Sequence, residues 1–134
     1  MIRNFFRATV TTLLATLACV AQAYPDRPIT VFVPFGAGTA VDVHGREFAQ
    51  ALGGVVNQPV VVDNRPGAEG TIGGMATLNA APDGHALMFT SSSIPVLDPV
   101  MKKNQQFDPV RDFTPICTVG RTSNVMNVTG SSSY

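Results

Sequence analysis

Two short segments of the chain carry residue types suited to binding an anion. The first is Phe35-Gly36-Ala37-Gly38, and it is followed closely by Thr39 and Asp42. Small residues let backbone N–H groups converge, and a helix beginning at Thr39 would point its partial positive end at the same place. The second segment is Thr90-Ser91-Ser92-Ser93, whose hydroxyls can donate to carboxylate oxygens or to bridging water. Together the two segments predict reversible capture of a small anion by neutral donors.

Each of these residues also has a purely structural interpretation. Gly36 and Gly38 can serve a tight turn, Asp42 can be only the acidic partner of a capping box, and the serines can simply solvate a loop. The two histidines, His44 and His85, have no second ligand at a useful spacing. We therefore expect no metal site and no catalytic residue, with His44 on a helix surface and His85 in a turn.

A nucleotide-dependent enzyme is the alternative from a different functional class. Gly36-Ala37-Gly38 could open a dinucleotide fingerprint, but the third glycine of that pattern falls at Val41. Asp63 ends an apolar run, where an acidic residue would hold a ribose. Arg65, close by, is expected to be a surface residue or a salt-bridge partner. The failure at Val41 favours a binding protein that is not an enzyme and needs no cofactor.

Alternating strands and helices are expected to position these segments. Strands are predicted at Ile29–Val33, Val60–Val62 and Ala86–Phe89. A first helix is predicted from Thr39 to Gly53-Gly54, and a second is marked by Ile72, Met75, Ala76 and Ala80. This alternation predicts an α/β fold with a parallel βαβαβ sheet, in which all loops that follow the strands share one edge. Beyond Val96 the pattern weakens.

The N-terminal residues 1–23 are predicted to be a signal peptide. Arg3 and Arg7 precede the apolar run Ala8 to Val20, and Ala21-Gln22-Ala23 supplies the small residues of a cleavage site before Tyr24. A transmembrane helix is the alternative, but the run is shorter than the roughly 20 residues that a bilayer requires. Lipidation at Cys19 is a further alternative. The signal predicts a periplasmic location for the mature chain.

Composition excludes other classes of partner. The 134 residues include nine Lys and Arg against nine Asp and Glu, and two of the basic residues belong to the predicted leader. The slight acidic excess that remains argues against nucleic acid as a partner. A mature chain of this size is expected to form at most one small domain, and we expect a monomer. Cys117, the other cysteine besides Cys19, lies in an apolar stretch and is predicted to be buried and inert.

The chain also resembles a known family. Its motifs are similar to those of the Bug family of extracytoplasmic solute receptors, the binding components of tripartite tricarboxylate transporters. The resemblance runs from Tyr24 to about Val125. It rests on Tyr24-Pro25, Arg27-Pro28-Ile29, Val33-Pro34-Phe35, Ala37-Gly38, Asp42, Val60-Val61-Val62, Asn64-Arg65-Pro66-Gly67-Ala68, Ile72-Gly73, Ala81-Pro82-Asp83-Gly84, Phe107-Asp108-Pro109-Val110 and Asp112-Phe113.

This resemblance implies the first lobe of a type II periplasmic binding fold, which captures a small carboxylate for the membrane components of such a transporter. Residues 24–125 would form an incomplete N-terminal lobe, and 126–134 a divergent tail. In the family the ligand's carboxylates meet the loops after the first and third strands, partly through water. The ligand-binding residues implied here are Phe35, Ala37, Gly38, Thr39, Asp42, Thr90, Ser91 and Ser92.

Three departures from the family pattern modify this expectation. Thr39-Ala40-Val41 replaces small residues and would narrow the backbone cradle. Glu69 replaces a glycine and adds negative charge near a site meant for anions. The chain also stops where the family continues into a second lobe. A truncated receptor that binds weakly, or a remnant that does not bind, is therefore the remaining alternative.

Overall fold

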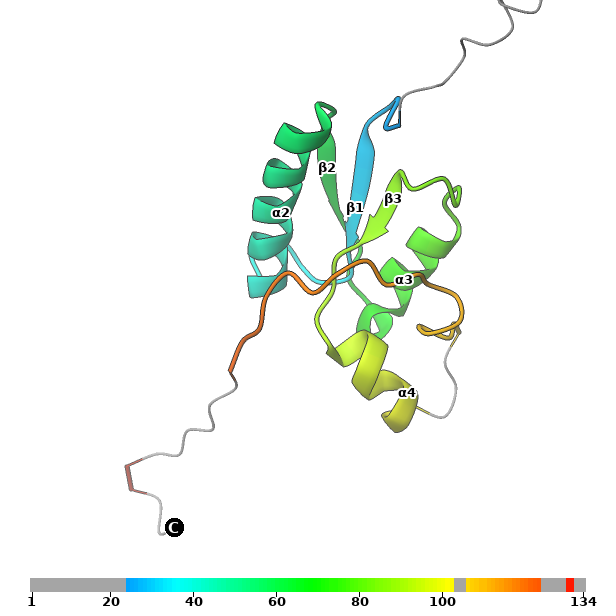
Figure 1. Ribbon diagram of the computed structural model, residues 1–134. Helices are drawn as coiled ribbons and strands as arrows, with labels where there is room; N and C mark the ends of the chain where they lie inside the picture. The colour runs from blue at the N-terminus through cyan, green and yellow to red at the C-terminus, as the bar shows by residue number, and fades with distance from the viewer. Residues whose placement is uncertain (1–23, 103–105, 124–129, 132–134) are drawn as a thin grey trace, which may run out of the picture.

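A computed structural model describes residues 24–102, 106–123 and 130–131, and Figure 1 shows a small parallel sheet flanked by helices. The strand order is β2-β1-β3, and β1 pairs in parallel with both neighbours. In Figure 1, α2 and α3 lie on opposite sides of the sheet. The elements in chain order are β1 (Ile29–Val33), α2 (Ala40–Val56), β2 (Val60–Asn64), η1 (Ala68–Gly70), α3 (Thr71–Leu78), β3 (Ala86–Met88), η2 (Ser93–Leu97) and α4 (Asp98–Met101).

The central strand β1 forms the core. Ile29, Val31 and Val33 are almost completely buried, and they alternate with the half-buried Thr30 and Phe32. β-Branched side chains favour the extended backbone, and a strand with neighbours on both edges buries them most efficiently. The predicted parallel βαβαβ arrangement is confirmed, and the predicted bounds of β1 are correct.

Helix α2 begins as predicted but ends later. Thr39 is its N-cap, and the Thr39 hydroxyl accepts a hydrogen bond from the Asp42 N–H. The predicted end at Gly53-Gly54 is wrong, because the helix continues through both glycines to Val56 and ends at Asn57 in a left-handed conformation. A Cβ at Gly53 would lie 3.3 Å from the Gln58 carbonyl oxygen. This glycine therefore allows the chain to approach closely, and asparagine tolerates the left-handed turn that follows.

Other bounds also differ from the sequence expectation. Strand β2 extends to Asn64, and β3 ends at Met88, although the Phe89 N–H still donates to the Phe32 carbonyl at 2.9 Å. Helix α3 ends at Leu78, so Ala80 lies outside it. The short helical segments η2 and α4 were not predicted. Prolines interrupt this stretch, which obscures its helical spacing.

The burial predicted for Cys117 is wrong, and His85, for which only a turn was predicted, is buried. Cys117 is exposed, because residues 114–123 form no helix or strand that covers it. His85 is only 6% exposed, since it directly precedes β3 and packs edge-on against the Tyr24 ring at 5.0 Å. His85 therefore lies in the bend before β3, as predicted for a turn residue, and its side chain is buried there.

The segment 106–123 follows α4 after a short gap. Phe107 is buried against Gly74 of α3, where a Cβ would collide with its ring. Among the described helices, none is both long and apolar enough to cross a membrane. The predicted leader 1–23, with Cys19, and most of the predicted tail 126–134 lie outside the described residues.

Candidate functional site

The loops that follow the three strands emerge at one edge of the sheet, because all three strands are parallel. The chain passes from β1 outward to β2 and then returns across β1 to β3. In open α/β sheets, ligands bind at the carboxyl edge where the connections change direction. That point lies between the loop after β1 and the loop after β3. The topology therefore brings the two predicted segments, 35–39 and 90–93, to the same edge.

The carboxylate of Asp42 binds the loop after β1 through the Gly38 N–H. This side chain is only 3% exposed. It accepts hydrogen bonds from the Gly38 N–H at 2.8 Å, from Asn64 Nδ2 at 2.8 Å and from Arg46 Nε at 3.1 Å. A second nitrogen of Arg46 lies 3.0 Å from its other oxygen. Asp42 thus connects the loop to α2 and to the end of β2.

These contacts also fix the charge of Asp42. The hydrogen bonds from Arg46, Gly38 and Asn64 lower the pKa of its carboxyl group to about 2. Asn64 completes the network by donating to the Phe35 carbonyl at 3.1 Å and accepting from Arg46 at 2.8 Å. The carboxylate accepts from Gly38, one residue before Thr39, so it does not form the reciprocal bond of the predicted capping box.

The remaining residues of this loop face outward. Ala37, Gly38 and Thr39 are exposed, and Phe35 is half-buried. The Thr39 hydroxyl donates to the Gly36 carbonyl at 2.8 Å, which closes a tight turn. Gly38 has a φ of 81°, which glycine adopts readily. The β-branched Thr39 therefore stabilises the turn by capping it.

The loop after β3 carries the predicted hydroxyls. Ser91 and Ser93 are linked through their Oγ atoms at 2.6 Å, and the Thr90 hydroxyl lies 3.4 Å from the Ser91 carbonyl. Thr90 and Ser91 are half-buried, whereas Ser92 is exposed. Ser93 begins the π-helical turn η2, so the hydroxyl run passes directly from the sheet edge into a short helix.

A cleft of about 590 Å³ opens at the same edge. Phe35 is the one member of the predicted ligand-binding set that lines it. Ser93 extends the hydroxyl run into its wall. The complete lining consists of Pro34, Phe35, Gly36, Pro66, Gly67, Glu69, Gly70, Ser93, Ile94, Asp98, Met101 and Lys102.

The loop after β2 joins this cleft through an ion-pair cluster. Lys102 Nζ lies 2.7 Å from Asp98 Oδ2 and 2.9 Å from Glu69 Oε2. The hydrogen bond from Lys102 to Asp98, and then that to Glu69, raises the pKa of the lysine. Sequence reasoning missed Asp98 and Lys102 as site residues. Their spacing of four residues is a helical ion-pair signal, but α4 was not predicted.

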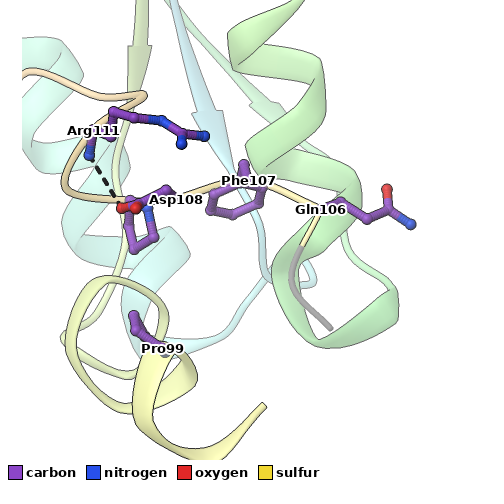
Figure 2. A pocket seen from close by; sticks show the side chains of 6 residues that line it. Pro99, Gln106, Phe107, Asp108 and Arg111 are labelled. Atoms are coloured by element: carbon purple, nitrogen blue, oxygen red, sulfur yellow. Dashed lines mark hydrogen bonds between the residues drawn. The ribbon is translucent and has the colours of Figure 1, made fainter. Parts of the chain in front are cut away.

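A second cavity, of about 320 Å³, lies between α4 and the segment 106–111 (Figure 2). Pro99 of α4 and Phe107 contribute to its lining, and Figure 2 also shows the Arg111 N–H donating to Asp108 at 3.1 Å. The Arg111 guanidinium is paired with Asp112 at 2.9 Å. The charged groups that line this cavity are thus bonded to neighbouring residues. None of the predicted ligand-binding residues lines the cavity.

Other polar residues have structural partners. His44 is exposed and pairs with Glu47, and Arg65 pairs with Asp63 at 2.9 Å, as expected for a salt-bridge partner. Within residues 24–102, 106–123 and 130–131, no group of three His, Cys, Asp or Glu side chains is arranged to hold a metal ion. Asp63 is thus engaged by its own neighbour.

Comparison with known proteins identifies relatives that match most of this chain. Residues 45–134 match the model of the tripartite tricarboxylate transporter family receptor. A UPF0065 protein of Bordetella bronchiseptica is 39% identical over 117 residues, which cover 87% of this chain and 35% of that protein. Protein BugT of Bordetella pertussis is 41% identical over 101 residues, which cover 75% of this chain and 31% of BugT. The chain thus spans about a third of the length of these relatives.

Solved structures give the same result for the fold. The periplasmic binding protein BugD superposes with a TM-score of 0.60 at 34% identity, over 69% of this chain and 31% of that one. A structure described as a periplasmic transporter superposes with a TM-score of 0.55 at 34% identity, and the match covers 66% of this chain and 30% of that one. The sheet is therefore part of a periplasmic binding fold. Sequence and fold agree, and the chain belongs to the tripartite tricarboxylate transporter receptor family.

Proposed function

We propose that this chain is the first lobe of a periplasmic receptor that captures a small carboxylate. The observation that carries the proposal is the Asp42 network, which holds the loop after β1 in one conformation at the point where the sheet connections change direction. Such preorganisation lowers the entropic cost of binding. Family membership supports a receptor and provides no support for an enzyme.

The predicted residues have different roles in this proposal. Asp42 and the Thr39 hydroxyl position the loop, since their polar atoms already bind the backbone of Gly36 and Gly38. Phe35 and Ala37 line the approach to the ligand. The ligand's carboxylate accepts hydrogen bonds from backbone N–H groups at the start of α2. On the other side of the crevice it meets Thr90, Ser91 and Ser92, directly or through water.

The cellular setting follows from the sequence and the family. Residues 1–23 direct export and are removed before Tyr24, which releases the mature chain into the periplasm. Residues 24–125 then form the lobe. The liganded receptor delivers its carboxylate to the membrane components of a tripartite tricarboxylate transporter.

Thermal unfolding of the purified chain with and without ligand tests this function. Citrate, malate, glutamate and nicotinate are each added in excess, because ligand that binds only the native state raises the unfolding midpoint. At a hundredfold excess over Kd the stabilisation is about 2.7 kcal/mol. A double variant, Thr90→Val with Ser91→Ala, should lose most of the shift. Ser123→Ala, at an exposed position beyond the lobe's elements, is the control and should keep it. No shift with any acid would contradict the proposal.

A further inference from the structure

Of the two buried titratable side chains in the described residues, Asp42 and His85, the proposed function uses only Asp42. His85 lies in the bend directly before β3, and its carbonyl accepts a hydrogen bond from the Thr30 N–H of β1 at 2.8 Å. Because the strands are parallel, this bend is at the amino edge of the sheet, opposite to the cleft. His85 therefore lies where both β1 and β3 begin.

Both ring nitrogens of His85 face carboxylates. Nδ1 lies 3.2 Å from Asp83 Oδ1 in a hydrogen bond, and Nε2 lies 3.2 Å from Asp26 Oδ1. The Nε2 atom is buried, yet within the described residues it makes no hydrogen bond. Its contact with Asp26 is therefore purely electrostatic, and the sign of that contact depends on whether Nε2 carries a proton.

A neutral ring cannot match both carboxylates. Neutral imidazole has one N–H group, so either tautomer turns the lone pair of the other nitrogen toward a carboxylate oxygen. The imidazolium ion has two N–H groups and presents positive charge to Asp26 and Asp83 together. Burial of the ring strengthens attraction and repulsion alike. Both contacts are thus attractive when the ring is protonated, and one is repulsive when it is neutral.

The same contacts hold the first described residues against the sheet. Residues 24–28, here called the N-terminal strap, run directly into β1 (Figure 1). The Tyr24 ring packs edge-on against the His85 ring at 5.0 Å, and its hydroxyl donates to the Gly84 carbonyl at 2.7 Å. A Cβ at Gly84 would lie 2.8 Å from that hydroxyl, so the strap approaches the bend closely.

Few charged groups surround the ring. The strap contributes Asp26 and the Tyr24 hydroxyl, and the bend contributes Asp83. Arg27 acts on the ring only through Asp83, to whose Oδ2 it donates at 2.6 Å. Hydrogen bonds from the His85 backbone N–H and from Arg27 lower the pKa of Asp83 to about 2. No other charged or titratable side chain in the described part of the chain bonds to the ring or stacks on it.

We propose that docking of the N-terminal strap depends on pH: the imidazolium form of His85 holds the strap on the amino edge of the sheet, and the neutral ring releases it. Histidine is the residue type that ordinarily changes charge between about pH 5 and pH 8. Because the strap continues into β1, the anchoring of the central strand then responds to the pH around the lobe. This inference does not involve the ligand, so it stands or falls separately from the proposed function.

Urea titrations of the purified chain at about pH 5.5 and about pH 8 test this inference. Asp26→Asn replaces the carboxylate beside Nε2 with an amide that can donate to the lone pair of the neutral ring. Relative to the wild type, its folding equilibrium constant should be about fivefold lower at the acid pH and equal or higher at the alkaline pH. The His44–Glu47 pair is present in both chains, so its own titration cancels.

Asp63→Asn is the matched control. Asp63 is also a partly exposed aspartate in an ion pair with an arginine, Arg65, but the structure pairs it with no histidine. This variant should change the folding equilibrium constant by the same factor at both pH values. If its effect were as dependent on pH as that of Asp26→Asn, the assignment to the carboxylate beside His85 would be overturned.

NMR spectroscopy of the wild-type chain measures docking directly. Cross-peaks between the Tyr24 and His85 rings report the docked strap, and they should weaken from about pH 5.5 to about pH 8. In Asp26→Asn they should change less. Cross-peaks of equal intensity at both pH values in the wild type would overturn release of the strap. A stability difference between wild type and Asp26→Asn that is the same at both pH values would overturn the role of His85.

Discussion

The loops after β1 and after β2 border the same cleft but are stabilised in different ways. The first is tied to a carboxylate that is almost fully buried, through partners on α2 and β2. The second passes through Ala68 and Glu69 with positive φ angles of 45° and 54°. Its described ion pairs join Arg65 to the neighbouring Asp63 and the exposed Glu69 to Lys102, which lies far along the chain.

This difference suggests that the loop after β1 positions the ligand and that the loop after β2 contributes to the choice of ligand. Several charge-assisted hydrogen bonds on one buried carboxylate hold a single geometry. An ion pair with an exposed partner contributes little to stability and can rearrange. The first loop therefore suits a contact that every ligand of such a receptor makes, and the second suits contacts that change from one receptor to another.

The largest expected effect is that of Asp42→Asn, which weakens the hydrogen bonds that hold the loop after β1. The amide loses the charge that Arg46, Gly38 and Asn64 bind, so the loop loosens and carboxylate affinity should fall by about tenfold or more. The measurement is titration with the best acid from the ligand screen. Arg46→Gln, which removes one partner of the carboxylate, should produce a smaller loss. Unchanged affinity in Asp42→Asn would show that the network does not position the site.

A steric change where the two loops meet should reduce stability. A Cβ at Gly73 would lie 2.6 Å from Pro34 Cβ and 3.1 Å from the Arg65 carbonyl oxygen, so it presses on both loops. Gly73→Ala should lower the free energy of unfolding by about 1–3 kcal/mol in urea titrations. Gly54→Ala, in a helix with open space around it, should instead raise this free energy by about 0.5–1 kcal/mol. Equal effects in both variants would contradict the packing argument.

The stability of the first loop should depend on pH in the acid range. The pKa of Asp42 is about 2 in the folded chain, below its ordinary value of 3.8. A carboxyl group with a lowered pKa stabilises the folded state above the ordinary value, and this contribution is lost as the pH falls toward 2. The wild-type chain should therefore lose more stability than Asp42→Asn between about pH 4 and pH 2. Asp83, whose pKa is also about 2, is present in both chains and cancels. Parallel acid titration curves would contradict this assignment.

The smallest effect is expected in the second loop. Ala68→Gly should raise the free energy of unfolding by about 0.5–1 kcal/mol, because relief of the left-handed conformation outweighs the added chain entropy. Ala51→Gly, in the middle of α2, should have the opposite sign and a similar size. Urea titration of both variants measures the difference, and a loss of stability in Ala68→Gly would show that this loop is not strained.

The parts of the fold with local signals were predictable from the sequence. The β-branched run of β1 and the Thr39 cap both involve residues near one another in the chain. The end of α2 could not be predicted, because Gly53 serves the contact with Gln58 and does not end the helix.

The cleft itself depends on contacts between distant residues. Glu69 was expected to add negative charge near the site, and in the structure Lys102 pairs with it, although nothing in the order of residues places the two together. His85 is buried because Tyr24 covers it from the beginning of the described chain. Cys117 is exposed although its apolar neighbours suggested a core. The direct contacts of the eight predicted ligand-binding residues remain predictions.

The position of β1 in the sheet has a consequence for the order of folding. This strand comes first in the chain, yet it lies in the centre, and it pairs with Val60 through Ile29 and with Ala86 through Thr30. No two strands of the described sheet can therefore form a local hairpin. Pairings between distant segments are slow to form, because the entropy of closing a long loop is lost before any contact compensates for it. During synthesis, the apolar strand β1 therefore emerges before β2 and β3. It stays unpaired until both of these strands are available.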